Sequence, residues 1–397
     1  MPDLLSIDEA LALVLERAQP LEREVVSITR AARRVLAEDV RPLVDLPPFR
    51  SSAMDGFAIR AADTQGRLRV VARAPAGHPS DRAVGPGEAI GIATGGSVPE
   101  GADAVVPIEH VDDHGDTIDT HGLVVSQANI RPIGSDIAAG DLLLPAGTLL
   151  GPAQIGALAA VGLAEVPCGR RPRVAILSTG SELRQAGESL GPGQIYESNA
   201  PMLSAALEGA GAEVFLLEPV ADDPGAHRAA FERGLDADVL VSSGGVSVGP
   251  HDLVRPTSSD LGVEEVFWGV GVKPGKPLAF GTRGRTLVFG LPGNPVSALV
   301  AAERFVRPAV LAMQGAAAPG PAYVVGRLGA PLRANPARDQ LVRARSRVEA
   351  GETVLEPLRG QESHMIARAA GADALVLVRR GERDPELGDR LPFLRLV

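Results

Sequence analysis

The sequence has little cysteine, few aromatic residues and an excess of negative over positive charge. One cysteine, Cys168, occurs in 397 residues, which excludes an intramolecular disulfide and any multi-cysteine zinc or iron–sulfur site. Aromatic residues make up 3% of the chain and the formal net charge is −10, so a general nucleic-acid-binding surface is not expected. An anionic ligand would therefore be bound by local cations and N–H groups.

Segments that would direct the chain into or across a membrane are also missing. The first residues, MPDLLSIDEA, are acidic and lack the basic start and apolar run of a signal peptide. No apolar stretch is long enough to span a bilayer. We therefore expect a cytoplasmic protein. Its length and its 45% of hydrophobic residues predict roughly two to four domains with buried cores.

Lysine is the rarest charged residue. Of the 39 Lys and Arg residues only two are lysines, Lys273 and Lys276, and both lie in GVKPGKPLAFG. A general preference for arginine reflects base composition, but two lysines three residues apart need a separate reason. Lysine carries a compact, rotatable ammonium where arginine carries a planar fork. The pair therefore indicates a site for a small oxyanion, the alternative being a solvated loop.

The first part of the chain predicts a helical domain that is interrupted by a β domain. A capping box opens an amphipathic helix over residues 6–18, and a second helix is expected around residues 30–38. Between these helices and a later one that starts near Pro152, short β-like segments are broken by Gly, Pro and Asp. We expect a discontinuous N-terminal helical domain of residues 1–44 and 137–168, and an inserted β domain of residues 45–136.

From residue 172 onward, strand and helix patterns alternate. RVAILS, AEVFLLEPV, ADVLVSS and TLVFG read as strands, with helical segments between them, which predicts a doubly wound parallel sheet. After about residue 318 the segments read as strands alone. The fold class we expect is therefore multidomain, α/β plus β. It has an α/β domain at residues 169–318 and a small β-barrel-like C-terminal domain at residues 319–397.

Unusual loops follow three strands of the predicted sheet. They are LSTGSEL (177–183), SSGGVSVGPHD (242–252) and LPGNP (291–295). Ligands of such sheets bind beyond the carboxyl ends of the strands, so these loops beside the two lysines predict a phosphate or oxyanion site. Neither a P-loop nor a dinucleotide fingerprint is present. For LPGNP the alternative is an ordinary helix N-terminus, with Asn294 as N-cap and Pro295 at the first helical position.

Several stretches together resemble one family. PPFRSSAMDGFAIRAAD, ATGGSVPEGADAVV, STGSEL, IYESNAPML, SSGGVSVGPHD, KPGKPLAFG and GLPGNPVSA occur in family order across roughly residues 45–300. The chain resembles the molybdopterin molybdenumtransferases, which act in molybdenum-cofactor synthesis and are related to the E domain of gephyrin. The resemblance implies an elongated homodimer of four-domain subunits with active sites at the subunit interface. It also implies a Mg²⁺-dependent reaction that inserts molybdenum from molybdate into adenylylated molybdopterin and releases AMP.

The resemblance also implies the site residues. Asp55, Asp252, Lys273 and Lys276 would be catalytic, and Glu182 and Asp252 would face Mg²⁺. Capping or turn formation is the alternative for Asp252 and Asp55, and a solvated first-turn acid for Glu182. The implied substrate-binding residues are Thr94, Asp136, Ser178, Thr179, Gly180, Ser243, Gly244, Gly245, Pro292, Gly293, Asn294, Pro295, Arg343 and Ser363.

The chain departs from the family pattern at a few positions. Leu253 stands where an aromatic residue is common, Pro256 should disturb the helix that follows, and Glu197 replaces an aspartate. Two other functions share parts of the pattern. A molybdopterin adenylyltransferase, also a possible partner, has the α/β domain alone, and a gephyrin-like scaffold would bind other proteins without needing the lysine pair. Neither nucleic acid nor a membrane is expected as a partner.

Overall fold

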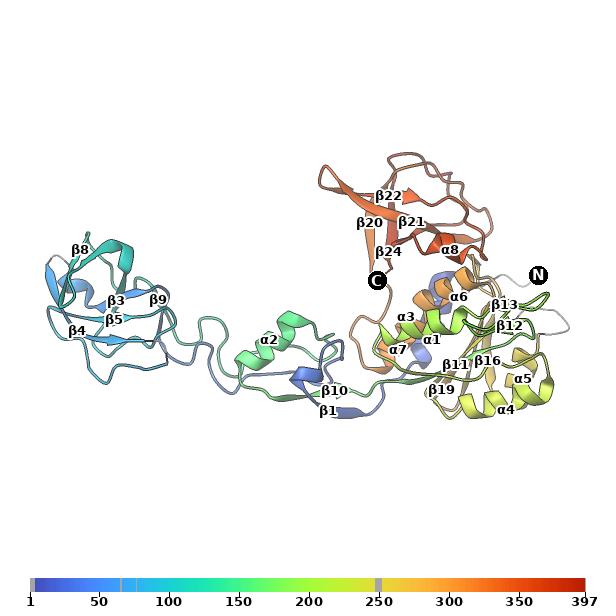
Figure 1. Cartoon of the computed structure of the whole chain (residues 1–397), viewed down its shortest axis with the longest axis horizontal. Coiled ribbons are helices and arrows are strands. Elements are labelled where there is room, and N and C mark those ends of the chain that lie inside the picture. The colour runs from blue at the N-terminus through green and yellow to red at the C-terminus, as the bar shows by residue number, and fades with distance from the viewer. Residues whose placement is uncertain (1–3, 65, 76, 247–251, 397) are drawn as a thin grey trace.

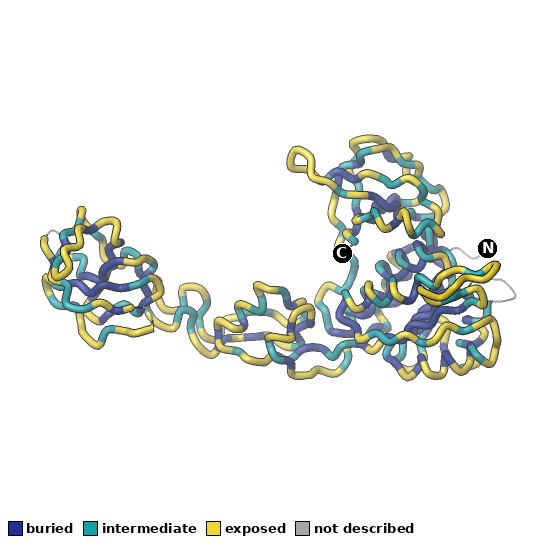
Figure 2. The backbone as a smooth tube through the Cα atoms, in the orientation of Figure 1, coloured by how far each residue is buried: buried dark blue, intermediate teal, exposed yellow. Residues whose placement is uncertain are grey.

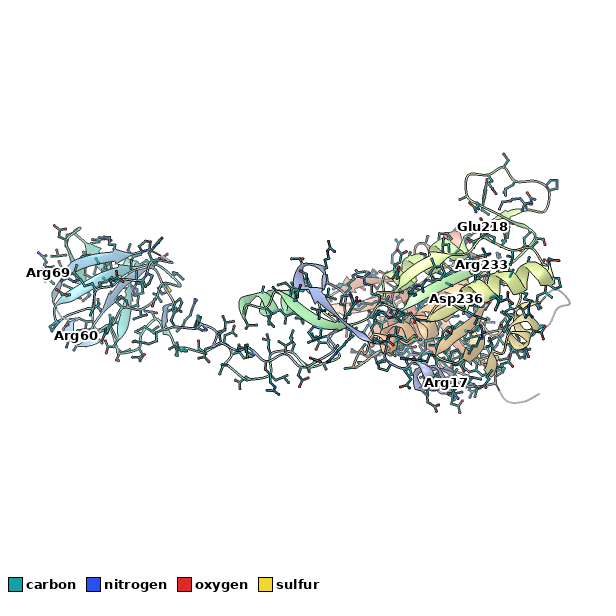
Figure 3. All side chains as sticks on the ribbon, turned by 90° about the horizontal axis from the view of Figure 1, so that it is seen from below. Arg17, Arg60, Arg69, Glu218, Arg233 and Asp236 are labelled. Atoms are coloured by element: carbon teal, nitrogen blue, oxygen red, sulfur yellow. The ribbon has the colours of Figure 1, made fainter. Side chains whose placement is uncertain are left out.

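The computed structural model describes residues 4–64, 66–75, 77–246 and 252–396. The molecule is elongated, with a β domain at one end, a small linking domain in the middle, and an α/β domain beside a C-terminal domain at the other end (Figure 1). In the perpendicular view, Arg60 and Arg69 mark the β-domain end, and Arg233 and Asp236 mark the opposite end (Figure 3). None of the helices among the described residues is long and apolar enough to cross a bilayer.

The α/β domain is built on a six-stranded sheet with the order β14-β11-β15-β19-β18-β16. The first four strands are parallel, and β18 pairs antiparallel with both β19 and β16. Helices cover both faces and form a separate core on each, so the expected doubly wound α/β architecture is confirmed, with an antiparallel edge. The strands are β11 (Arg173–Ser178), β14 (Glu213–Leu216), β15 (Val239–Ser243), β16 (Glu264–Trp268), β18 (Ala279–Arg283) and β19 (Thr286–Leu291).

Helices lie between the parallel strands of this domain, as the alternating pattern predicts. Asp223 caps α4 by accepting a hydrogen bond from the Ala226 N–H at 2.8 Å. The long final helix contains one π-helical turn, η4, between α6 and α7. The elements are α3 (Asn199–Glu208), α4 (Pro224–Gly234), α5 (Val254–Asp260), α6 (Pro295–Ala301), η4 (Ala302–Val306) and α7 (Arg307–Met313), with a two-stranded flap of β12 (Leu183–Arg184) and β13 (Ile195–Tyr196).

The first helix, α1 (Ile7–Arg17), has the expected capping box between Ser6 and Glu9. Its buried side chains Ile7, Ala10 and Val14 belong to the same core as the α/β sheet. The helix thus packs on the α/β domain, although its residues lie in the range expected for the N-terminal helical domain. The apolar face of α1 packs on the layer of helices that covers the sheet. The linking domain does not offer such a layer.

The linking domain joins segments that are far apart in the sequence. Its strands β1 (Arg23–Ser27) and β10 (Glu165–Gly169) pair antiparallel, and α2 (Pro152–Ala160) begins at Pro152 as expected. The prediction of a helix around residues 30–38 is wrong. Only a 3₁₀ turn, η1 (Ile28–Arg30), forms there, because the following backbone pairs with residues 147–150 and 167–169 instead.

The β domain is a six-stranded sheet with two small cores. The two chain segments that join it to the linking domain are largely exposed, whereas dark blue strands fill its centre (Figure 2). Its elements are β2 (Ser51–Ser52), β3 (Gly56–Ile59), η2 (Ala61–Asp63), β4 (Arg67–Ala74), β5 (Glu88–Ile92), β6 (Ala104–Pro107), η3 (Ile108–His110), β7 (Val111–Asp113), β8 (Thr117–Thr120) and β9 (Ile130–Arg131).

The C-terminal domain is a closed barrel, which confirms the barrel-like expectation. Its strands pair in the ring β21-β22-β20-β24-β23, and β23 returns to β21. The short strand β17 (Val272–Lys273) comes from the α/β segment and pairs parallel with β21, so the two domains are joined through backbone. The barrel contains β20 (Tyr323–Leu328), β21 (Asp339–Glu349), β22 (Glu352–Pro357), α8 (Ile366–Ala369), β23 (Ala374–Val378) and β24 (Arg390–Arg395).

Candidate functional site

A cavity of about 710 Å³ lies beyond the carboxyl ends of the parallel strands. Ser178 at the end of β11 is in register with Ser243 at the end of β15, and Ser243 is in register with Leu291 of β19. The three loops therefore leave the sheet at one level, and topology alone brings them together. The cavity is lined by Ser178, Thr179, Gly180, Glu182, Leu183, Ile195, Tyr196, Glu197, Ser198, Asn199, Asp222, Ser243, Gly244, Gly245, Val246, Asp252, Pro277, Pro292, Gly293, Asn294, Pro295, His364 and Ile366.

The loop after β11 requires glycine at Gly180. This residue has φ +153°, and a Cβ there would lie 2.6 Å from Oε2 of Glu182. The Glu182 carboxylate is thus folded over the Gly180 backbone at the cavity wall. Thr179 is held to the neighbouring strand, because its N–H donates to the Ser243 carbonyl at 3.0 Å.

The loop after β15 packs its backbone directly against the first loop. Gly244 has φ +99°, and a Cβ there would lie 2.6 Å from the Thr179 carbonyl oxygen. Residues 247–251 of this loop lie outside the described residues, but Asp252 lines the cavity. Asp252 directly precedes Leu253, which occupies the N-cap position of α5 without a side-chain capping hydrogen bond.

Pro256 does not break α5, contrary to expectation. The helix runs from Val254 to Asp260 with Pro256 in its first turn, where the N–H that proline lacks would have no intrahelical acceptor.

The LPGNP turn is more than a helix start. Asn294 occupies the N-cap position of α6, but its side chain makes no capping hydrogen bond. Its Nδ2 donates instead to Ser363 Oγ at 3.0 Å, in the C-terminal domain. The Gly293 carbonyl accepts a hydrogen bond from Asn199 Nδ2 at 2.8 Å. The turn therefore connects the α/β loops to the barrel and to α3.

Glu197 and Asn199 lie at the start of α3. The sequence had predicted no function for either residue. Glu197 Oε1 accepts hydrogen bonds from the N–H groups of Asn199 and Ala200 at 2.7 and 2.9 Å and from Ser178 Oγ at 3.0 Å. Asn199 is 8% exposed, and its Oδ1 has no hydrogen-bond partner among the described residues. The motif IYESN contains both, but nothing local reveals that they contact loops some 20 to 95 residues away.

The C-terminal domain contributes His364 and Ile366 to the cavity wall. Arg343 is 1% exposed, and its guanidinium donates to the carbonyls of Gly360, Glu362 and Met365 at 2.9, 3.2 and 3.3 Å. Burial lowers the pKa of Arg343. In this structure Arg343 thus holds the loop that carries Ser363 and His364.

Neither of the two lysines is among the residues that line the cavity. Pro277, which follows Lys276, does line it. The Lys276 carbonyl accepts the Val270 and Leu278 N–H groups, so this loop has a fixed backbone. Lys273 is exposed on β17, in register with Gln340 of the barrel.

Asp55 and Thr94 contact each other in the β domain, which lies at the opposite end of the molecule from the α/β domain (Figure 1). The Asp55 carboxylate accepts hydrogen bonds from the Thr94 N–H at 2.7 Å and its hydroxyl at 3.0 Å. These hydrogen bonds, the backbone one foremost, lower the pKa of Asp55. Asp136 is exposed on the segment that joins the β domain to the linking domain. Within one chain, these three residues are not brought to the cavity.

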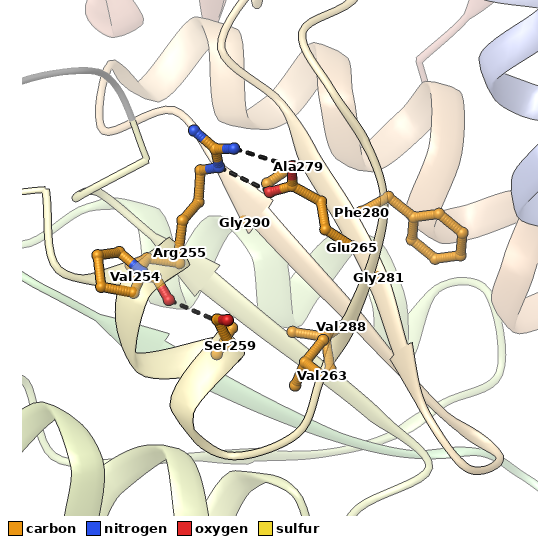
Figure 4. Close-up of a pocket in the computed structure, with 12 residues that line it drawn as sticks. Val254, Arg255, Ser259, Val263, Glu265, Ala279, Phe280, Gly281, Val288 and Gly290 are labelled. Carbon is orange, nitrogen blue, oxygen red and sulfur yellow. Dashed lines mark hydrogen bonds and ion pairs between the residues drawn. The ribbon is translucent and has the colours of Figure 1, made fainter.

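A second, smaller cavity of about 380 Å³ lies under α5 at the antiparallel edge of the sheet (Figure 4). Its wall is mostly apolar, and its one charged pair is Arg255 with Glu265, joined by two hydrogen bonds of 2.6 and 2.8 Å. Arg255 also stacks on Trp268 at 4.9 Å. This cavity offers no unpaired charged group for an anion.

Family models cover nearly all of the chain. The "MoeA N-terminal region (domain I and II)" matches residues 5–162, the "probable molybdopterin binding domain" residues 175–312, and the "MoeA C-terminal region (domain IV)" residues 325–396.

Individual relatives agree with the family models. A molybdopterin molybdenumtransferase of Haemophilus influenzae is 39% identical over 79% of this chain and 78% of its own. A molybdopterin molybdenumtransferase of Staphylococcus aureus is 31% identical over 98% and 94%. The crystal structure of a molybdopterin biosynthesis MoeA protein from Pyrococcus horikoshii superposes with a TM-score of 0.85 and 28% identity, over 99% of this chain and 100% of that one. The chain thus belongs to the MoeA family of molybdopterin molybdenumtransferases, enzymes that insert molybdenum into molybdopterin.

Proposed function

We propose that this chain inserts molybdenum from molybdate into adenylylated molybdopterin and releases AMP. One observation carries the proposal. Three loops rich in glycine and hydroxyl groups converge on a single cavity with carboxylates on its wall, and Pro277, from the segment that carries the only two lysines of the chain, also lines it. A phosphoanhydride needs N–H donors and cations around its oxygens. The dithiolene sulfurs that bind molybdenum come from the pterin, in keeping with a protein whose one cysteine, Cys168, is buried elsewhere.

The cavity fits Mg²⁺ by the chemistry of its donors. Glu182 and Asp252 both line it, and Mg²⁺ is usually held by one or two carboxylates together with substrate phosphates. Among the described residues no group of three or more His, Cys, Asp or Glu side chains gathers into a metal site. When bound, Mg²⁺ would neutralise phosphate charge, and Glu182 and Asp252 would hold it.

The chain's own groups bind and orient the substrate. The loops of Ser178, Thr179 and Gly180 and of Ser243, Gly244 and Gly245 would shape the cavity around the phosphates, while the N–H groups of Thr179, Gly180 and Gly244 donate to backbone carbonyls. The turn from Pro292 to Pro295 would hold its free N–H groups toward an anion. Lys273 and Lys276 would bind molybdate or the terminal phosphate from the rim, and Ser363 and Arg343 would support molybdate from the barrel side.

Asp55 enters this scheme only from a second chain. It lies with Thr94 at the far end of the molecule, so we propose a homodimer in which each site draws on both subunits, with Asp136 near the shared region. We also propose that the chain works in the cytoplasm, next to the adenylyltransferase that makes its substrate.

The test is a direct assay. Purified protein is incubated with adenylylated molybdopterin, Mg²⁺ and molybdate, and AMP and the molybdenum-loaded pterin are measured over time. AMP and loaded pterin forming together, only when both Mg²⁺ and molybdate are present, are expected. If the substrate stays intact under all these conditions, the proposed function is wrong.

A further inference from the structure

We propose that His364 contacts the substrate and binds a tetrahedral oxyanion at the barrel side of the cavity. The proposal rests on the proposed function for the nature of the anion, and it concerns a residue to which no motif assigned a role. The anion is either a phosphate group of the nucleotide or molybdate, which share the same chemistry of negatively charged oxygens.

The charge of the cavity wall is the first argument. Four carboxylates line it, those of Glu182, Glu197, Asp222 and Asp252, whereas His364 is the only basic side chain among the described lining residues. Two of these carboxylates can be offset by Mg²⁺, but an anionic substrate would still meet repulsion from the others. A group that donates hydrogen bonds to the anion is therefore needed on the wall itself, and His364 is placed to provide it.

The way the loop around His364 is held is the second argument. On one side, Arg343 binds the carbonyls of Gly360, Glu362 and Met365, which flank His364. On the other side, the Ser363 carbonyl accepts the Val296 N–H at 3.0 Å, at the start of α6. A buried arginine and an interdomain bond thus fix the backbone before any ligand arrives. A preorganised donor binds an anion without an ordering cost.

The chemistry of imidazole is the third argument. Its ring presents one N–H donor when neutral and two when protonated, so it can bind an oxyanion in either state. The loop also carries Glu362, and Lys276 lies nearby in the segment that ends at Pro277 on the cavity wall. His364 would therefore bind the anion from the barrel side of the cavity wall.

Two ligand titrations test this on the full-length protein. AMP alone and molybdate alone are titrated by calorimetry into wild type, His364→Ala, His364→Asn and His364→Arg, and KM and kcat are measured for AMP release. Losing one charge-assisted hydrogen bond weakens binding by about tenfold. We expect the Ala and Asn variants to lose about that factor for one of the two probes, and the Arg variant to recover most of it.

Two matched controls accompany these variants. Arg359→Ala removes an exposed charge next to the loop that carries His364, and His78→Ala removes an exposed histidine of the β domain. Both should bind AMP and molybdate like the wild type. Thermal melting of every variant shows that it is folded, and the milder Asn variant serves if the Ala variant is not.

The outcomes separate the two sources of the anion. Weaker AMP binding assigns His364 to the phosphate, and weaker molybdate binding assigns it to molybdate. The proposal is overturned if both affinities are unchanged in folded Ala and Asn variants, if the controls weaken as much, or if the wild type binds neither probe. A wild type that binds the probes but releases no AMP refutes the proposed function alone, because the titrations still judge His364.

Discussion

The cavity of the α/β domain and the Asp55–Thr94 pair of the β domain make an instructive contrast. Both depend on polar groups placed at strand ends. In the α/β domain, Ser178, Ser243 and Leu291 end neighbouring strands in register, so their loops meet within one chain. In the β domain, the Asp55 carboxylate binds one residue, Thr94, beside an open hollow of about 430 Å³ that is largely apolar.

The contrast shows two ways in which a fold can prepare a site. A parallel sheet gathers distant segments at one edge, so a single chain lines the cavity. The end of the antiparallel pair β3–β5 fixes one carboxylate in a set conformation and leaves the other groups to come from elsewhere. The following experiments test this difference between a cavity lined by one chain and a carboxylate, that of Asp55, whose partners at the site would come from a second chain.

The largest effect is expected at the two lysines. Lys273→Ala and Lys276→Ala should each lower the molybdate-dependent rate on the order of 100-fold, because each removes a cation that faces developing or bound negative charge. The melting temperature should change little, since Lys273 is exposed. AMP release is measured across a range of molybdate concentrations. Arginine at either position should rescue only in part, and wild-type rates in both Ala variants would contradict the role.

The second experiment asks whether Asp55 works in trans. Inactive Asp55→Ala and Lys273→Ala proteins are unfolded together and refolded as a mixture. If each site combines Asp55 of one subunit with Lys273 of the other, a mixed dimer has one site with both lesions and one with neither. Random pairing makes about half of the dimers mixed, so activity should return to roughly a quarter of wild type.

The controls for this mixture are each variant refolded alone, which should remain inactive, and native mass spectrometry, which counts the mixed dimers. Mixed dimers without activity would place Asp55 in its own subunit's site or outside any site. The contrast between the two regions would then lose its functional meaning.

The same contrast explains how far the sequence could predict the molecule. Strand periodicity, the alternation of strands with helices and the glycine loops are local, so the α/β sheet and its site edge were predictable. The helix around residues 30–38 was wrong because that segment pairs with strands and turns far along the chain. His364 and Asn199 could not be found for the same reason, since their contribution depends on how separate domains and loops pack.

A smaller effect is expected at the LPGNP turn. Pro292→Ala should raise KM for the adenylylated substrate by a few-fold and leave the melting temperature nearly unchanged. The reason is that Pro292 stiffens the start of α6, where Asn294 and Gly293 already bind Ser363 and Asn199. Steady-state kinetics and thermal melting are compared on the same preparation. Normal kinetics with a lower melting temperature would show that the turn serves the helix alone.

The smallest expected effect is a difference between the two regions in how much acid lowers their stability. His227 on α4 is 0% exposed, and neither ring nitrogen has a hydrogen-bond partner among the described residues. Burial lowers the pKa of His227 below its ordinary value of 6.5, against the opposing charges of Asp222 and Asp223. Below pH 6.5 His227 binds more protons in the unfolded chain than in the folded chain. The contribution of neutral His227 to the stability of the fold is therefore present above pH 6.5 and is lost as the pH falls toward the folded pKa.

The β domain should not share this loss. Its described histidines are exposed, and Arg67 foremost lowers the pKa of Asp119 to about 2, so its ion pairs persist well below pH 5. Calorimetric melting at pH 7 and pH 5 should therefore shift the α/β transition on the order of a few degrees more than the β-domain transition. His227→Leu should remove that extra shift, because the buried position then binds no proton in either state. Equal acid shifts of the two transitions, or an unchanged extra shift in the Leu variant, would show that His227 does not set the acid sensitivity of the α/β domain.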